Sequence, residues 1–248
     1  MRVLALDTTT PAGSVAVVDD ERVIAERSGD RSRTHAQRLP RELFETLDAA
    51  GARLEDVDAF AVACGPGSFT GLRIGIATIQ GLAYVADRPV VAVSALDALA
   101  HAAAAVRDRD AVIAAWMDAH RREVFFALYR VGNGAPFDPA RLVTIDDAAV
   151  GDPASTIDRW TTPSASQPSV FIGDGAVLYA AVIRERMPAA SIVESPLLAG
   201  TIGRVAAIAV QRGAATPAAG IRPLYVRRPD AELAREKKDA AYEEQRQR

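Results

Sequence analysis

Short apolar runs and amphipathic stretches alternate along most of this 248-residue chain, in the order that α/β proteins show. The clearest unit lies at residues 57–87, where an apolar run at 59–64 leads into GPGSFTG and then into leucine and isoleucine at helical spacing. An apolar run bounded by glycine and proline is typical of a buried strand, and the later spacing is typical of a helix. The pattern predicts a strand, a glycine turn and a helix in succession.

The residues before this unit predict a hairpin and a helix. Two apolar runs, at 2–6 and 14–18, flank the polar sequence DTTTPAG, which begins at Asp7. A carboxylate at a strand end, beside hydroxyls and backbone N–H groups, could bind phosphate and Mg²⁺, although such a sequence is more often only a turn. Residues 34–50 follow as a helix, because apolar side chains recur there every four residues before Gly51.

The second half of the chain repeats this pattern after about 110 residues, which indicates an internal duplication. A strand at 111–117 ends at Asp118 and has a hairpin partner at 123–130, and a strand, a glycine turn and a helix follow at 169–186. The glycines of the two turns correspond in pairs, which are Gly65 with Gly67 and Gly173 with Gly175.

We expect two lobes and a tail: an N-terminal lobe over residues 1–107, a C-terminal lobe over 108–228 and a charged tail over 229–248. Residues 132–168 contain many turn formers and predict a loop-rich insertion with a little structure around 140–149. The tail mixes charge signs, so it is either a solvated helix or a frayed end.

Composition restricts the partners and the compartment. The net charge is −3, so the chain has no overall basic field that would hold nucleic acid by itself. The single cysteine, Cys64, lies in an apolar run, which indicates a buried, inert thiol in a reducing compartment. No secretory pattern opens the chain, and its longest apolar helix falls short of the roughly 20 residues that a bilayer needs. These features predict a cytoplasmic protein without a membrane segment.

The first glycine turn has two interpretations. Free backbone N–H groups at the start of a helix can bind an anion, and Arg73, one turn into that helix, is the nearest cation. The turn is not a P-loop, because the only lysines are Lys237 and Lys238, and its GxGxxxG spacing is not a dinucleotide fingerprint. Alternatively, the glycines only let the helix pack closely on the sheet, and Arg73 extends into solvent.

The sequence has no metal or hydrolase signature. His35, His101 and His120 stand apart, without a second histidine or cysteine at ligand spacing, so we expect no protein metal site. Neither GxSxG nor HExxH occurs, which argues against a peptidase. Ser68, after the glycine turn, is a better helix cap than nucleophile.

Five stretches carry a resemblance to a known family. They are LALDTTTPAGSVAVV near the N-terminus, HAQRLPREL on the first helix, GPGSFTGLRIGIATIQGLA at the glycine turn, WMDAHRREVFFALY in the second half and PLYVRRPDAE near the C-terminus. Together they resemble the TsaB (YeaZ) family of bacterial tRNA threonylcarbamoyladenosine biosynthesis proteins. The resemblance covers nearly the whole chain apart from residues 132–168, and it departs from the family at His120, where an MDAR signature usually has arginine.

The resemblance implies a duplicated ribonuclease-H-like α/β fold with two lobes, as in the actin and sugar-kinase superfamily. In that superfamily the first hairpin and the second-half glycine turn bind phosphate and adenosine. We expect no intrinsic cofactor beyond weak binding of ATP or ADP with Mg²⁺, since cations that would neutralise phosphates are sparse. The residues expected at this nucleotide site are Asp7, Thr8, Thr9, Gly65, Gly67, Gly173, Asp174 and Gly175.

The family's catalytic relative, TsaD, has an HxxxH metal pair on its first helix, whereas here His35 is followed at that spacing by Leu39. The resemblance therefore implies no catalytic residues and no activity of the chain alone. It implies a subunit that supports a TsaD-like catalytic subunit, with a TsaE-like ATPase, in transferring a threonylcarbamoyl group to the adenosine beside the tRNA anticodon. Contact with tRNA would come only through this complex. The alternative is a free-standing actin-like ATPase or sugar-kinase-type phosphotransferase.

The partner surface is expected on two helices, and the chain alone would form a homodimer through the same surface. Two helices against two from a partner could bury the roughly 1,600 Å² of a standard interface, although each helix also needs one inward face. The residues expected at the interface are His35, Leu39, Leu43, Leu47, Leu72, Ile76 and Ile79.

Overall fold

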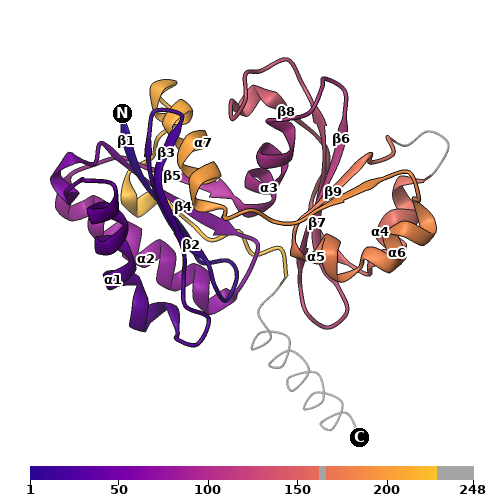
Figure 1. The fold of residues 1–248 in the computed structure, drawn as a ribbon, viewed down its shortest axis with the longest axis horizontal. Coiled ribbons are helices and arrows are strands. Elements are labelled where there is room, and N and C mark those ends of the chain that lie inside the picture. The colour runs from indigo at the N-terminus through magenta and orange to yellow at the C-terminus, as the bar shows by residue number, and fades with distance from the viewer. Residues whose placement is uncertain (162–165, 228–248) are drawn as a thin grey trace, which may run out of the picture.

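The computed structural model describes residues 1–161 and 166–227, which form two α/β lobes side by side (Figure 1). The first lobe holds a five-stranded sheet in the order β3-β2-β1-β4-β5. The pairs β1–β2 and β2–β3 are antiparallel, and the pairs β1–β4 and β4–β5 are parallel. The strands are β1 (Arg2–Asp7), β2 (Ser14–Asp19), β3 (Arg22–Ser28), β4 (Ala59–Gly65) and β5 (Val90–Ser94).

The second sheet repeats this arrangement. Its order, β8-β7-β6-β9-β10, matches the first sheet strand for strand, with antiparallel pairing from β6 to β8 and parallel pairing from β6 to β10. The strands are β6 (Val112–Asp118), β7 (Val124–Val131), β8 (Leu142–Gly151), β9 (Val170–Ile172) and β10 (Ser191–Val193). The duplicated ribonuclease-H-like α/β fold with two lobes that the sequence predicts is therefore confirmed.

Helices cover the outer faces of both sheets and fill the space between the lobes (Figure 1). The outer face of the first sheet carries α1 (His35–Ala49) and α2 (Phe69–Ala86), and that of the second carries α4 (Pro153–Trp160), α5 (Asp174–Leu178) and α6 (Ala180–Arg186). Between the sheets lie α3 (Ala95–Ala104) and α7 (Ala199–Gln211). Single 3₁₀ turns occur at Leu54–Asp56, Pro139–Arg141 and Ala218–Gly220.

Alternating side chains on the central strands build two outer cores and one inner core. On β1, Leu4 packs with the apolar side chains of α1 and α2, whereas Val3 belongs to the cluster that contains α7. On β6, Trp116 packs in the outer core of the second lobe and Met117 faces inward. Because both sheets, α3 and α7 contribute to the same inner cluster, the lobes share one hydrophobic core.

Two segments differ from their expected structure. The segment 132–168, expected to be loop-rich with a little structure around 140–149, contains β8 at that place, paired with β7 along most of its length, and in addition α4, which was not expected. Helix α7 lies within the expected C-terminal lobe in sequence, but it packs against β1, β2 and β4 of the first sheet, whose inner face would otherwise lack a cover. The predicted charged tail lies outside the described residues.

Helix α2 is long and apolar enough, by length and composition alone, to cross a membrane, and it is the one such helix in the described ranges. Core helices of soluble proteins pass the same test. Here Leu72, Ile76 and Ile79 are buried on the side of α2 that faces the first lobe.

His101 on α3 is buried without a compensating hydrogen bond. Its side chain is 3% exposed, and its Nδ1 has no partner among the described residues. Burial lowers the pKa of His101 from 6.5 to about 4, against the opposing charge of Asp138. The neutral form is thus the one that fits the fold.

We predict that His101 makes the fold less stable in mild acid. The pKa of His101 is lower in the folded than in the unfolded chain, so protonation favours the unfolded chain. The free energy of unfolding is therefore unaffected by this group above pH 6.5 and declines as the pH falls toward about 4. Between pH 7 and pH 5 the loss from this group is about 2 kcal/mol. Urea unfolding at both pH values should show this loss in the wild type and a correspondingly smaller one in His101→Leu. An equal pH dependence of the two proteins would contradict the assignment.

Candidate functional site

A cavity of about 1000 Å³ opens between the lobes, at the carboxyl ends of β1 and β6. This edge of a parallel sheet is where α/β folds place their ligands. The first hairpin and the first glycine turn form one wall, and the end of β6 and the start of α5 form the opposite wall. Residues 195–198 before α7 and residues 224–227 near the C-terminus complete the lining.

Asp7 lies on the first-lobe wall at the end of β1. Its Oδ1 accepts hydrogen bonds from the backbone N–H of Thr9 over 2.8 Å and from the Thr9 hydroxyl over 2.6 Å. Burial raises the pKa of Asp7, the two bonds from Thr9 oppose this, and the charge of Asp174 across the cavity raises it further. A cation between the carboxylates of Asp7 and Asp174 would favour the ionised form of Asp7, against both its burial and the charge of Asp174.

The second-lobe wall repeats this geometry. Asp118 ends β6, and its Oδ1 accepts from the backbone N–H of His120 over 2.8 Å, two residues later, as Asp7 does from Thr9. Asp174 Oδ1 accepts from the backbone N–H groups of Asp118, over 3.1 Å, and Gly175, over 2.9 Å. Partial desolvation raises the pKa of Asp174, these bonds lower it, and the nearby Asp118 raises it again.

Half of the residues expected at a nucleotide site line the cavity. Asp7, Thr9, Gly67 and Asp174 do so. Thr8 is fully buried beneath α2, and Gly65, Gly173 and Gly175 lie behind the lining residues. The cavity lining thus contains two carboxylates, one hydroxyl and one glycine of this set, whereas Thr8 and the other three glycines lie deeper in the fold.

The glycines of the first turn make room for close packing. A Cβ on Gly67 would lie 2.6 Å from Thr9, and a Cβ on Gly65 would lie 2.7 Å from the carbonyl oxygen of Leu224. On α2, a Cβ on Gly71 or Gly75 would overlap Thr8. The interpretation in which the glycines seat the helix on the sheet accounts for Gly71 and Gly75, whereas Gly67 makes room for the hairpin loop and Gly65 for the C-terminal segment.

The second glycine turn uses the same device. A Cβ on Gly173 would overlap the carbonyl oxygen of Trp116, and one on Gly175 would lie 2.7 Å from the carbonyl carbon of Met117. The N–H of Gly173 bonds to Val193 and that of Gly175 to Asp174, so neither points freely into the cavity.

His35 holds the first hairpin loop in place. Its Nε2 lies 3.1 Å from the carbonyl oxygen of Thr10, and its Nδ1 lies 2.8 Å from Nη2 of Arg38. Arg38, 4% exposed, also donates to the carbonyl oxygens of Pro11 and Ala12. Burial and the charge of Arg38 lower the pKa of His35, so it is a neutral structural group at pH 7.

Cys64 is half-buried at the end of β4 and does not line the cavity. Burial raises the pKa of its thiol to about 11, helped by the charge of Asp97. A thiol with this pKa is protonated at neutral pH and is a poor nucleophile.

Comparisons with known proteins identify the family. The chain matches the family model of TsaD, tRNA N6-adenosine threonylcarbamoyltransferase, over residues 28–234. The tRNA threonylcarbamoyladenosine biosynthesis protein TsaB of Haemophilus influenzae is 43% identical over 129 residues, which are 51% of this chain and 53% of that one. The structure of YeaZ from Pseudomonas aeruginosa is 34% identical, covers 90% of this chain and 99% of that chain, and superposes with a TM-score of 0.71.

The chain belongs to the TsaB (YeaZ) family. The matched part spans about half the length of the curated TsaB relatives. Component A of the (R)-2-hydroxyglutaryl-CoA dehydratase from Acidaminococcus fermentans, 13% identical with a TM-score of 0.50, shares the fold alone.

The tip of the β6–β7 hairpin has an unusual backbone conformation. His120, Arg121 and Arg122 have backbone φ angles of 56°, 54° and 63°, a left-handed conformation that side chains rarely adopt. Nδ1 of His120 lies 3.1 Å from Asp118, and His120 lines the cavity. The histidine is therefore attached to a cavity carboxylate at a strained turn.

The residues expected at the TsaB partner interface are in the interior, which corrects that assignment. Each is at most 9% exposed, because the apolar faces of α1 and α2 cover their own sheet. The buried residues are His35, Leu39, Leu43, Leu47, Leu72, Ile76 and Ile79. The outer side of these helices carries other residues.

Sequence reasoning missed a cluster that joins distant segments at the cavity. Arg73 and Phe69 of α2 contact Tyr225, and all three line the cavity. The position of Arg73 near the glycine turn indicated a cation at the site. No local sequence pattern, however, relates Arg73 to a tyrosine 152 residues later.

A matched pair of glycines tests whether close packing seats α2. Gly75→Ala should destabilise the fold by about 1–3 kcal/mol, because its Cβ meets the buried Thr8. Gly81→Ala on the same helix, where a Cβ has open space, should stabilise it by about 0.5–1 kcal/mol. Urea unfolding measures both. A similar change of the same sign in the two variants would show that contact with Thr8 is not what requires glycine.

Proposed function

We propose that this chain acts in tRNA threonylcarbamoyladenosine biosynthesis as a non-catalytic partner of a TsaD-like catalytic subunit. TsaB relatives are named for this process, which supports the pathway. The observation that carries the partner role is an exposed apolar surface on α1 and α2. Because the chain also matches the TsaD family model, we expect a partner with a similar pair of helices.

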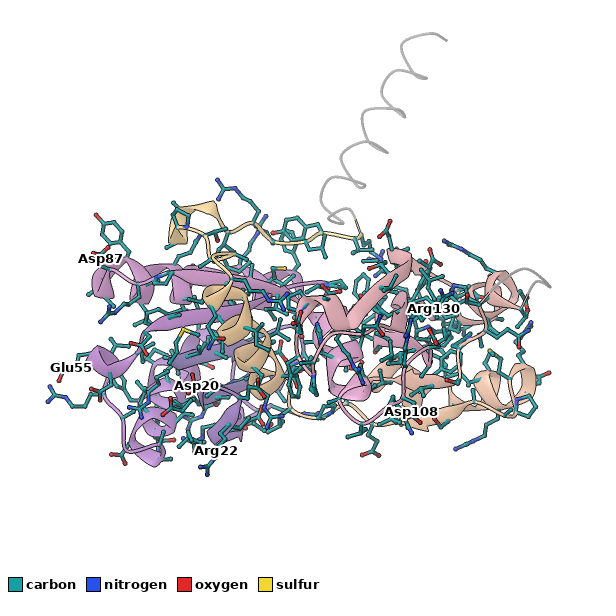
Figure 2. All side chains as sticks on the ribbon, turned by 90° about the horizontal axis from the view of Figure 1, so that it is seen from above. Asp20, Arg22, Glu55, Asp87, Asp108 and Arg130 are labelled. Carbon is teal, nitrogen blue, oxygen red and sulfur yellow. The ribbon has the colours of Figure 1, made fainter. Side chains whose placement is uncertain are left out.

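The surface follows the outer side of α2 and includes one large side chain of α1. Phe44 is 64% exposed, Tyr84 is 84% exposed and Val85 is 81% exposed. Gly81 and Ala77 lie on the exposed side of α2, about one and two turns before Tyr84. We call these five residues the partner face. Asp87, directly after α2, marks the end of this helix at the outer side of the first lobe, away from the second (Figure 2).

The chemistry of the partner face suits helix packing. Contiguous exposed apolar side chains are uncommon on soluble monomers and are typical of interaction sites. Small residues between large ones let a second helix approach to the usual 8–10 Å. We propose that the same face holds a homodimer when the chain is alone, so a TsaD-like subunit would compete with self-association.

The further members of the complex are also proposals. A TsaE-like ATPase would join the pair of subunits, and tRNA would be met only through the complex, since a net charge of −3 gives this chain no basic field of its own. We also propose that the chain works in the cytoplasm.

We propose that the cavity binds ATP or ADP weakly, with Mg²⁺, and that the chain needs no other cofactor. Asp7 and Asp174 both line the cavity, the charge of Asp174 raises the pKa of Asp7, and carboxylates are the ligands that Mg²⁺ prefers. The described residues include no group of three or more metal-ligating side chains, so phosphate oxygens would complete the coordination. The carboxylates would hold the ion, and the ion would neutralise the phosphates.

A free-standing ATPase or phosphotransferase is the second candidate. The carboxylates that end β1 and β6 in matching turns favour it, because phosphoryl transfer needs a carboxylate for Mg²⁺ and one for the attacking group. Purified chain that shows Mg²⁺-dependent ATP turnover without partners would support it, and turnover at buffer level would exclude it.

Reconstitution tests the partner role directly. The assay combines tRNA, the threonylcarbamoyl-adenylate donor, a TsaD-like subunit and a TsaE-like ATPase, with or without this chain, and measures modified adenosine by mass spectrometry. We expect product that depends on the chain. Equal product without it would remove the proposal while leaving the fold intact.

We predict that Gly81→Arg prevents partner binding without harming the fold. A Cβ at Gly81 meets nothing, and arginine is a better helix former than glycine, so the melting temperature should stay equal or rise. The long charged side chain would keep a partner helix away, and affinity for the TsaD-like subunit should fall at least about tenfold, a cost near 1.4 kcal/mol. Calorimetric titration measures it.

Ala181→Arg is the matched control, because Ala181 is exposed on α6 of the second lobe. It should bind the partner as the wild type does. Unchanged binding by Gly81→Arg, or equal losses in both variants, would place the interface elsewhere.

A further inference from the structure

Two aromatic side chains hold Arg73 at the edge of the cavity. The Arg73 guanidinium lies over the Phe69 ring, with Cζ 3.8 Å from the ring centroid. Its Nε donates a hydrogen bond to the Tyr225 hydroxyl over 3.0 Å. The rings of Phe69 and Tyr225 pack 5.1 Å apart. The side chain of Arg73 is exposed, yet its orientation is set from two sides.

Tyr225 belongs to a segment that is anchored on the first lobe. The N–H of Leu224 donates to the carbonyl oxygen of Cys64 over 2.7 Å, where the missing side chain of Gly65 makes room. Gln80 of α2 donates to the carbonyl oxygen of Ala218 over 2.8 Å, just before this segment. We call residues 221–227 the strap. In Figure 2 the segment that follows α7 runs along one side of the molecule from the first lobe toward the second.

The far end of the strap is attached to the second lobe. Nη1 of Arg227 donates to the carbonyl oxygen of Ala119 over 2.6 Å, and Nη2 pairs with Glu123. The guanidinium also lies 5.5 Å from the centroid of the Phe125 ring. With both ends attached, the strap places Tyr225 beside the start of α2 as a fixed support.

Arg73 keeps two nitrogens for a ligand. Phe69, Arg73 and Tyr225 all line the cavity, and Nη1 and Nη2 of Arg73 have no hydrogen-bond partner in the part of the chain that the structure describes. A guanidinium fork of this kind matches the oxygens of a phosphate group. Arg31 also lines the cavity without a described partner, but no aromatic ring supports it.

We infer that Arg73 binds the phosphate groups of the cavity's ligand, and that Tyr225 and Phe69 are its positioning residues. A side chain held in place before binding loses less conformational entropy when the ligand arrives. The carboxylates of Asp7, Asp118 and Asp174 also line the cavity, so a phosphate group that Mg²⁺ does not bridge to them is directed toward Arg73. The inference rests on the proposed nucleotide site and is independent of the partner role.

Calorimetric titration with ATP and Mg²⁺, inorganic pyrophosphate and adenosine tests this assignment. Arg73→Gln should weaken ATP and pyrophosphate binding about tenfold or more and leave adenosine unchanged. Tyr225→Phe keeps the ring and removes the hydroxyl, so it should weaken the two phosphate ligands about threefold to tenfold. Adding Tyr225→Phe to Arg73→Gln should not weaken binding of the two phosphate ligands any further, because the hydroxyl acts only through Arg73.

Two variants serve as controls for this experiment. Arg31→Gln should weaken ATP less than about twofold, since an unsupported surface cation contributes little. Tyr179→Phe, on a tyrosine that does not line the cavity, should change nothing. The assignment is overturned by full affinity in Tyr225→Phe, by equal losses for adenosine, or by a wild type that binds neither ATP nor pyrophosphate. Partner binding is measured separately, so either proposal can fail while the other holds.

Discussion

The close approach of each glycine turn to the end of the neighbouring central strand, β1 in the first lobe and β6 in the second, determines where the cavity lies and what lines it. In the first lobe Gly71 and Gly75 let α2 rest on Thr8, and in the second Gly173 lets α5 begin against Trp116. Asp7 stands directly before Thr8, and Asp174 stands directly after Gly173. The side chains of both residues therefore line the cavity between the lobes. A side chain at any of these glycines would lift a helix from its sheet and move one wall of the cavity.

The shared inner core limits how these walls can move. Helix α7 packs against the first sheet and against α3, and α3 contacts strands of both sheets, so a change in the angle between the lobes would have to repack this apolar cluster. The strap adds a second link at the cavity, from Cys64 of the first lobe to Ala119 of the second. Recognition in this cavity therefore depends on side chains already in place, such as Arg73, more than on closure of the lobes.

Local patterns predicted the elements and their duplication, because strand and helix periods are properties of neighbouring residues. Asp7 could be placed at a strand end for the same reason. Whether the apolar face of α1 packs inward or against a partner could not be predicted, since periodicity identifies an apolar stripe but not what covers it. Leu43, 5% exposed, covers the chain's own sheet, and Phe44, beside it in sequence, is 64% exposed. A single helix needs its inward face first, so the regular stripe is core and the irregular apolar residue is surface.

The same limit applied to contacts between distant segments. Tyr225 and Arg73 meet because the chain returns across α2 after α7, and no period or motif encodes that path. Helix α7 was expected with the second lobe for its place in the sequence, whereas the uncovered face of the first sheet decides its position.

The surroundings of His35 and Leu39 explain in physical terms why the first helix is unsuited to a pair of metal ligands at this spacing. Both nitrogens of His35 are engaged, one with Thr10 and one with Arg38, and the pair holds the loop that carries the cavity's first wall. Leu39, one turn later, is 2% exposed in the outer core. The two positions thus serve a buried polar network and an apolar core. A histidine in place of Leu39 would bury a polar ring among leucines, and His35 could reach a metal only by releasing the hairpin loop.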